Sequence, residues 1–139
     1  GLIRRFHEAK ESDSPTVEVW GSGTPRREFL YVDDMASASI HVMGLERKQY
    51  RQAVNERESI LNVGYGSDFS ISDVAKNIAL IVGYEGEIRF NSEKPDGPPQ
   101  KLLDCTKLKK SGWKPSTTFE AGLKLAYADF LQNLLNLRS

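Results

Sequence analysis

Residues 19–43, VWGSGTPRREFLYVDDMASASIHVM, hold the side chains of this sequence that are best suited to bind an anion. Arg26 and Arg27 follow a turn that contains two glycines and a proline. Guanidinium groups bind phosphate oxygens through paired hydrogen bonds, so an arginine in a cleft is a good phosphate ligand. Alternation along a strand sends the two side chains to opposite faces, and we expect Arg27 to face the ligand. The alternative for Arg27 is a surface ion pair with Glu18 or Glu28.

Five other residues are further candidates for binding a ligand, and each has a plainer structural alternative. Arg4 and Arg5 share an expected helix, about 100° apart, so at most one of them faces a given ligand. Trp20 ends an expected strand and can stack on a flat ring, or it can be an ordinary core residue. Asp96 and Lys101 flank a loop, where binding groups often lie, but Asp-Gly is also an ordinary turn pair.

Two stretches imitate the glycine fingerprint of dinucleotide-binding folds. GSGTPR, residues 21–26, has Arg26 at the third glycine position and leads into a strand. GYGSDF, residues 64–69, lies between an expected strand and a helix, but Phe69 holds the third position and the acidic residue expected ~20 positions later is missing. We therefore expect both glycine pairs to form tight turns, and we assign no cofactor-binding residue.

The sequence shows no catalytic or metal-binding constellation. None of the five tyrosines is followed four residues later by a lysine. His7 and His41 have no carboxylate or cysteine partner at ligand spacing. Cys105 is the single cysteine, which excludes an internal disulfide and a cysteine-based metal cage, and we expect it to be a small buried residue. We therefore predict neither a catalytic residue nor a metal site in this chain.

Length and charge limit the class of protein. The 139 residues suit one domain with one core, residues 1–139. The formal net charge is zero and no apolar run approaches the ~20 residues of a membrane span, so we predict no nucleic-acid partner and no membrane. A single cysteine fits a reducing, cytoplasmic setting. The sequence starts without a methionine, inside an expected amphipathic helix, which indicates a piece of a longer protein.

Strands alternate with helices, which indicates an α/β fold. We expect strands at residues 16–20, 27–32, 60–64 and 87–90, and helices at 2–10, 33–46, 71–82 and 119–134. Residues 60–64, ILNVG, are almost entirely apolar, which is typical of a strand buried on both faces. Because this chain offers few helices to cover such a strand, we infer that it joins a larger sheet whose other strands are missing here.

Two of the expected helices carry specific predictions. The helix after Ser70 has a capping pattern with Asp73, and Gly83 ends it. Its apolar positions are expected in the core; they are Val74, Ala75, Ile78, Ala79 and Val82. The helix that begins at Asp33 or Asp34 is expected to bury one face with Ala36, Ile40 and Met43.

Three stretches of the sequence resemble one enzyme family. VWGSGTPRREFLYVDDMASASIHVM, LNVGYG and KPDGPPQKLLDCTKLKKSGW together are similar to the C-terminal part of the GDP-L-fucose synthases, in the extended short-chain dehydrogenase/reductase (SDR) superfamily. The resemblance covers essentially the whole chain, in order. It implies an α/β fold that is the C-terminal substrate-binding domain of an extended SDR enzyme whose N-terminal Rossmann core is missing. Residues 60–64 would be a strand that normally joins the Rossmann sheet.

The same resemblance implies an activity for the complete enzyme. The family epimerises GDP-4-keto-6-deoxy-D-mannose at C3 and C5 and reduces C4 with NADPH, which gives GDP-L-fucose. NADP and the catalytic residues belong to the missing N-terminal part, so we expect this chain alone to be inactive. The full-length enzyme is expected to be a cytoplasmic homodimer with a GDP-sugar as its substrate.

The resemblance also assigns roles to five residues. Arg5 of LIRRFH, Arg27 of TPRREF and Lys101 of PPQKLLD resemble the group that grips the diphosphate. Trp20 of VWGSG and Asp96 of KPDG resemble contacts to the sugar nucleotide. Three alternatives stay open: another nucleotide-sugar epimerase, dehydratase or reductase; a non-catalytic nucleotide-sugar binding module; and a structural domain in which the cations do not converge.

Overall fold

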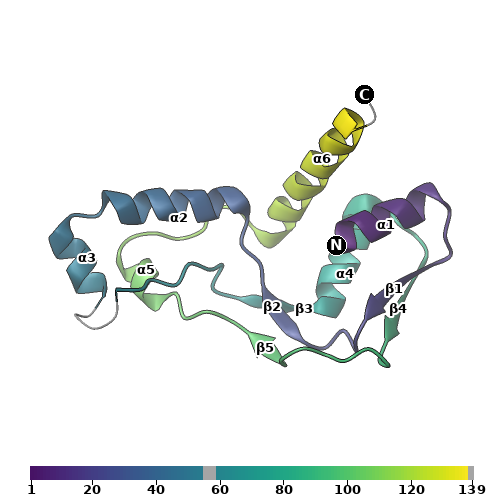
Figure 1. Ribbon diagram of the computed structural model, residues 1–139, viewed down its shortest axis with the longest axis horizontal. Coiled ribbons are helices and arrows are strands. Elements are labelled where there is room, and N and C mark those ends of the chain that lie inside the picture. Colours follow the sequence, from purple (N-terminus) through teal and green to yellow (C-terminus); the bar gives the residue numbers. More distant parts are fainter. Residues whose placement is uncertain (55–58, 138–139) are drawn as a thin grey trace.

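The computed structural model describes residues 1–54 and 59–137, and Figure 1 shows how their helices and strands are arranged. Helices and strands are interspersed along the chain, which confirms the α/β class. No described helix has both the length and the apolar content that crossing a membrane requires. The elements are α1 (Leu2–Glu11), β1 (Thr16–Trp20), β2 (Arg26–Glu28), α2 (Val32–Gly44), α3 (Arg47–Ala53), β3 (Asp68–Ser70), α4 (Ile71–Val82), β4 (Glu87–Asn91), β5 (Gln100–Lys101), α5 (Thr106–Lys110) and α6 (Phe119–Leu137).

The strands form two small sheets that lie next to each other in Figure 1. β1 pairs in parallel with β4, from Thr16 opposite Glu87 to Trp20 opposite Asn91. β2 is the central strand of the other sheet, antiparallel to β3 and parallel to β5. The loop of residues 92–99 connects β4 in one sheet to β5 in the other. Because β4 pairs with β1 and β5 pairs with β2, this loop lies next to the turn between β1 and β2.

The larger core lies where α1 and α4 pack on β1 and β4. All five apolar residues predicted for the inner face of α4 are buried there, with Phe6 of α1 and two valines of β1. The hydroxyl of Ser70 accepts a hydrogen bond from the backbone N–H of Asp73, and Gly83 ends α4 at φ 73°. The predicted start, end and buried face of α4 are therefore confirmed.

A smaller core forms between α2 and α5. Ala38, Leu108 and Trp113 are its buried residues. The predicted inner face of α2 is wrong, because Ile40 and Met43 are 70% and 85% exposed. The small side chain of Ala38 faces the partners instead, which allows Leu108 and Trp113 to pack close to the helix.

Residues 60–64 form no strand in this chain, and Ile60 is 72% exposed. An extended segment becomes a strand only when a neighbour pairs with its backbone, and none of the described strands does so. That the segment joins a larger sheet stays a prediction.

Two other segments differ from the expected boundaries. The expected strand at 27–32 ends at Glu28, and the charged region after α2 contains the helix α3. Residues 55–58 of that region are outside the described part.

Candidate functional site

The turn between β1 and β2 is built by two glycines. Gly21 and Gly23 have φ angles of 85° and 79°, in the left-handed region that favours glycine. A Cβ on Gly23 would lie 2.5 Å from Cε1 of Phe90, which leaves no room for a side chain. The predicted tight turn is confirmed, and it leads into β2 rather than into a helix.

The loop of residues 92–99 folds back onto this turn. The carboxylate of Asp96 accepts hydrogen bonds from the backbone N–H and the hydroxyl of Ser22, at 2.9 and 2.6 Å. These two bonds, with a smaller contribution from the positive charge of Arg27, hold the pKa of Asp96 below its ordinary value. Asp96 is therefore an ionised anchor of the loop at neutral pH.

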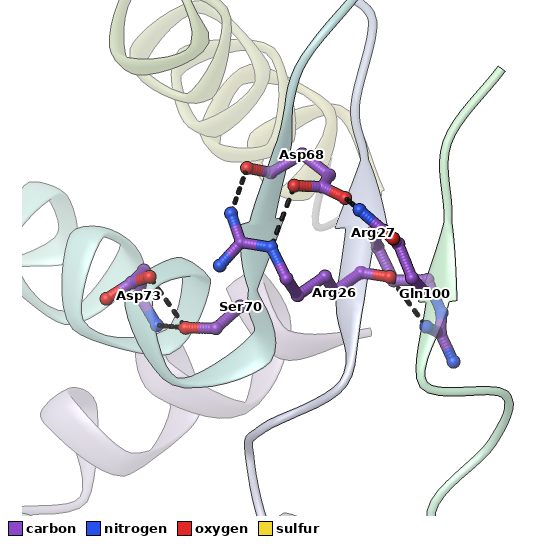
Figure 2. A network of polar contacts seen from close by, with 6 residues as sticks. All are labelled: Arg26, Arg27, Asp68, Ser70, Asp73 and Gln100. Atoms are coloured by element: carbon purple, nitrogen blue, oxygen red, sulfur yellow. Dashed lines mark hydrogen bonds and ion pairs between the residues drawn. The ribbon is translucent and has the colours of Figure 1, made fainter. Parts of the chain in front are cut away.

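The two arginines of β2 point to opposite faces, as predicted. Arg26 binds Asp68, with 2.8 Å between Nε and Oδ1, and Gln100 donates to the same carboxylate. Figure 2 shows Arg26 and Gln100 meeting at Asp68, while Arg27 points away from it. Parallel pairing places Lys101 of β5 directly opposite Arg27, so the two cationic side chains leave the same face of the sheet.

Arg27 does not form the surface ion pair that was the alternative for it. Its Nη1 donates to the carbonyl oxygens of Arg26 and Pro98, at 2.7 and 2.8 Å. The carboxylate of Glu28 instead accepts from the backbone N–H groups of Gly66 and Leu103, at 2.6 and 3.1 Å. The guanidinium is thus held by neutral backbone oxygens, and these contacts do not neutralise its positive charge.

Trp20 is not a core residue, because 60% of it is exposed at the end of β1. Two cations lie over its ring: Cζ of Arg5 is 5.3 Å from the ring centroid, and Nζ of Lys94 is 5.6 Å from it. Arg5 comes from α1 and also donates to the carbonyl oxygen of Glu18, at 3.4 Å. The larger core fixes α1 against β1 and thereby places Arg5 beside Trp20.

Three of the five predicted residues line one small concavity of about 90 Å³. They are Trp20, Arg27 and Asp96, and the rest of the wall comes from residues such as Gly23 and Pro95. The other two are neighbours of these residues: Arg5 lies over the ring of Trp20, and Lys101 is paired with Arg27. Lys101 itself does not line the concavity.

Larger hollows lie elsewhere on the chain, and their chemistry is different. One of about 570 Å³ lies between the loop at residues 65–67 and the segment at 112–118, and one of about 500 Å³ lies between α2 and α6. The second is lined mainly by aromatic and aliphatic side chains. We place the candidate site at the small concavity because Trp20, Arg27 and Asp96 line it and Arg5 lies over the ring of Trp20.

Ser22 and Lys94 belong to this region but are absent from the sequence-based predictions. Ser22 binds Asp96 across 74 positions of sequence, so no local pattern indicates that pair. Lys94 could have been found from the sequence more easily than Ser22, because it belongs to the KPDG motif that also contains Asp96. Its position over Trp20 depends on how the loop folds back, which only the tertiary structure shows.

The described residues do not fit a dinucleotide cofactor. Such a site needs a strand, a glycine-rich turn and a helix whose N-terminus faces the pyrophosphate. The turn at Gly21 and Gly23 leads into β2, and the turn at Gly64 and Gly66 leads into β3. Neither turn therefore leads directly into a helix, as such a site requires.

The histidines and the cysteine have structural partners. Nδ1 of His7 lies 3.1 Å from the hydroxyl of Tyr127, and Nε2 of His41 lies 3.0 Å from that of Ser111. Cys105 is buried, as predicted, and its burial raises the pKa of the thiol. Within residues 1–54 and 59–137, no group of three or more histidine, cysteine or acidic side chains could hold a metal ion.

Comparison with known proteins shows which proteins this chain is similar to. Residues 1–64 match the model of the NAD dependent epimerase/dehydratase family. The GDP-L-fucose synthase of Escherichia coli (strain K12) is 52% identical over 132 residues, which are 95% of this chain and 41% of that protein. The GDP-L-fucose synthase of Sinorhizobium fredii (strain NBRC 101917 / NGR234) is 41% identical over 133 residues, which are 96% of this chain and 40% of that protein.

A solved structure agrees with these relatives. The GDP-mannoheptose C4 reductase from Campylobacter jejuni with NADP bound is 34% identical, with a TM-score of 0.78 over 94% of this chain and 43% of that chain. NADP use is thus found in the family. The chain spans about two fifths of the length of the curated relatives it matches. Over nearly all of its own length, this chain is therefore homologous to part of the GDP-L-fucose synthases, in the NAD dependent epimerase/dehydratase family.

Proposed function

We propose that this chain is the substrate-binding part of a GDP-L-fucose synthase. The complete enzyme would be an NADP-dependent oxidoreductase and isomerase that epimerises GDP-4-keto-6-deoxy-D-mannose at C3 and C5 and reduces C4. In this proposal Arg5, Arg27 and Lys101 hold the diphosphate, and Trp20 and Asp96 contact the sugar nucleotide. We also propose that the complete enzyme is a cytoplasmic homodimer, as in the family it resembles.

The observation that carries the proposal is that the three cations lie in or next to the concavity lined by Trp20, Arg27 and Asp96. Lys101 is paired with Arg27 in the sheet, and Arg5 lies over Trp20. A diphosphate carries about two negative charges, and cations that share its oxygens bind it through charge-assisted hydrogen bonds. Because Arg26 is engaged by Asp68, Arg27 is the β2 arginine that suits this task.

The role of these residues would be to bind and orient rather than to react. Binding energy from the nucleotide end of a substrate holds the distant sugar in position for chemistry. The 4-keto group of the sugar makes the protons at C3 and C5 acidic, and general bases would remove and return them. We propose that those bases and NADP lie outside this chain, which alone would catalyse neither reaction.

Titration calorimetry with GDP tests this proposal. We expect the 139-residue chain to bind GDP more tightly than UDP, and to bind it more weakly as salt rises, because salt screens the charges. Arg27→Gln should weaken GDP binding about tenfold, since it removes charge-assisted hydrogen bonds. Arg47→Gln, on exposed α3, is the matched control for loss of one charge and should bind like the wild type.

Two results would contradict the proposal. One is a chain that binds no GDP, and the other is an Arg27→Gln variant that binds GDP as tightly as Arg47→Gln does. Oxidation of NADPH by the chain alone, in the presence of GDP-4-keto-6-deoxy-D-mannose, would contradict the expected inactivity.

A second candidate is the same part of another nucleotide-sugar epimerase, dehydratase or reductase. The observation behind this alternative is that the chain is also 34% identical to a GDP-mannoheptose C4 reductase. A preference of the chain for UDP or dTDP over GDP would support a member that acts on other nucleotides. A complete enzyme that reduces a GDP-heptose but leaves GDP-4-keto-6-deoxy-D-mannose unchanged would support a GDP-sugar reductase of that kind.

A further inference from the structure

Trp20 has a second cation over its ring, and that cation belongs to none of the five residues assigned above. Nζ of Lys94 lies 5.6 Å from the ring centroid, close to the 5.3 Å of Cζ in Arg5. Both distances fall within the ~6 Å over which an aromatic face attracts a cation. Trp20 as a whole remains 60% exposed, so the two cations lie over its ring at a surface that is open to solvent.

The backbone of Lys94 is fixed at the site. Its N–H donates to the carbonyl oxygen of Asn91 at 3.1 Å, at the end of β4. Two residues later, the carboxylate of Asp96 is bound by Ser22 of the β1–β2 turn. The four-carbon side chain of a lysine keeps rotational freedom, so the ammonium group can move while the backbone stays in place.

Two possible contacts of the Lys94 ammonium group differ in strength, and this difference determines its position when an anion binds. A cation–π contact at an exposed site changes an equilibrium constant by about two- to fivefold. A charge-assisted hydrogen bond to a phosphate oxygen changes it by about tenfold or more. A lysine within reach of both therefore leaves the ring for the phosphate, and the face of the indole that it covered becomes available.

We propose that Lys94 is a further diphosphate-binding residue, held on the Trp20 ring in the free chain and transferred to a phosphate oxygen when a nucleoside diphosphate binds. This inference rests on the proposed function, because it requires that the ligand of this wall be a nucleoside diphosphate. The departure of Lys94 uncovers Trp20 for contact with the flat part of the ligand. Lys94 thus both binds the anion and regulates access to the ring.

Substitution of Lys94 by glutamine tests the binding role. We expect Lys94→Gln to weaken GDP binding by about tenfold in calorimetry at low salt. Lys48→Gln is the matched control, because it removes one exposed lysine charge from α3, which lies far from β1 and β4 in Figure 1. The control should bind GDP within about twofold of the wild type, since distant exposed charges are largely screened.

Tryptophan fluorescence tests the transfer. The chain has two tryptophans, so the spectrum of the Trp20→Phe variant is subtracted to isolate the emission of Trp20. We expect GDP to change that emission in the wild type. In Lys94→Gln the emission should already differ before GDP is added, and saturating GDP should change it by less.

The outcomes separate this inference from the proposed function. If the wild-type chain binds GDP and Lys94→Gln binds it equally tightly, the inference is wrong and the proposed function stands. An unchanged Trp20 emission in GDP-saturated wild type would overturn the transfer in the same way. If the wild-type chain binds no GDP, the proposed function fails and this inference fails with it.

Discussion

At the scale of single residues, Asp34 is the charged side chain that this structure buries most completely among the described residues, with 2% exposed. Its Oδ1 accepts from the backbone N–H and the hydroxyl of Ser116, at 3.0 and 2.8 Å, and its Oδ2 accepts from the N–H of Thr117, at 3.0 Å. Burial raises the pKa of Asp34, but these hydrogen bonds outweigh it and the net pKa is lowered. The carboxylate ties α2 to the segment that precedes α6.

This arrangement predicts a loss of stability in acid. A carboxyl group whose pKa is lowered by folding stabilises the native state above its unfolded pKa, near 3.8, and the stabilisation is lost as the pH falls through the lower native value. Asp34→Asn should lower the free energy of unfolding at pH 7 by about 2–3 kcal/mol, because hydrogen bonds to a charged acceptor are lost.

Urea unfolding from pH 7 to pH 2 measures both effects. Asp33→Asn is the control, because Asp33 is the exposed neighbour on α2. The variant of Asp34 should also show a weaker decrease of stability below pH 4 than the control. Equal stabilities of the two variants at pH 7 would show that the buried carboxylate is not the anchor described above.

At the scale of elements, α4 is the helix whose sequence and structure agree best. Ser70 and Gly83 mark its ends, and its buried residues repeat at the helical period, so the information that specifies it is local. α2 is different. Its most apolar stripe is exposed, because the helix packs through Ala38 instead. Leu108 and Trp113, from a distant part of the sequence, contact Ala38 and so determine which face of α2 is buried.

The N-cap of α4 is open to a direct test. Ser70→Ala should lower the free energy of unfolding by about 1 kcal/mol, because the N–H of Asp73 loses its acceptor at 3.0 Å. Ser72→Ala removes a hydroxyl from the first turn of the same helix without removing the cap, and it should change stability by less than half as much. The midpoints of urea unfolding compare the two, and a larger effect of Ser72→Ala would refute the cap assignment.

At the scale of the whole molecule, two apolar cores of unequal size lie on either side of the β2 sheet. Among the residues that the structure describes, the larger contains ten buried residues from α1, β1, α4 and the turn after α4, and the smaller contains three. Figure 1 shows α2, α3 and α5 extending away from the elements of the larger core. Local unfolding starts where few apolar contacts are buried, so the two cores should differ in stability.

This difference predicts two separate unfolding transitions. In a Trp20→Phe background, Trp113 reports on the smaller core, while circular dichroism at 222 nm reports mainly on the helices of both. We expect the emission of Trp113 to change at a urea concentration about 0.5 M or more below the main loss of helix signal. Coincident transitions would show that the cores unfold as one unit.

Two variants identify which core each transition belongs to. Leu108→Ala removes a fully buried side chain from the smaller core and should abolish the Trp113 transition while it leaves the main helix transition in place. Val74→Ala should lower the midpoint of the main transition instead. A variant of Leu108 that shifts both transitions equally would contradict the independence of the cores.

Features that depend on neighbouring residues could be predicted from the sequence. Strand alternation predicted that Arg26 and Arg27 face opposite ways. The spacing of Gly21 and Gly23 predicted a tight turn between β1 and β2. Both features depend on backbone geometry over only a few residues. Residues 60–64 show the limit of such reasoning, since an apolar run becomes a strand only beside a partner.

Contacts between groups that are distant in sequence could not be predicted in this way. Ser22 binds Asp96 across 74 positions, Lys101 lies beside Arg27, and Lys94 lies over Trp20, and none of these contacts follows from local periodicity. Each depends on the loop of residues 92–99 folding back over the β1–β2 turn. Side-chain type and spacing fix the local direction of a group, whereas the packing of the whole chain fixes its neighbours.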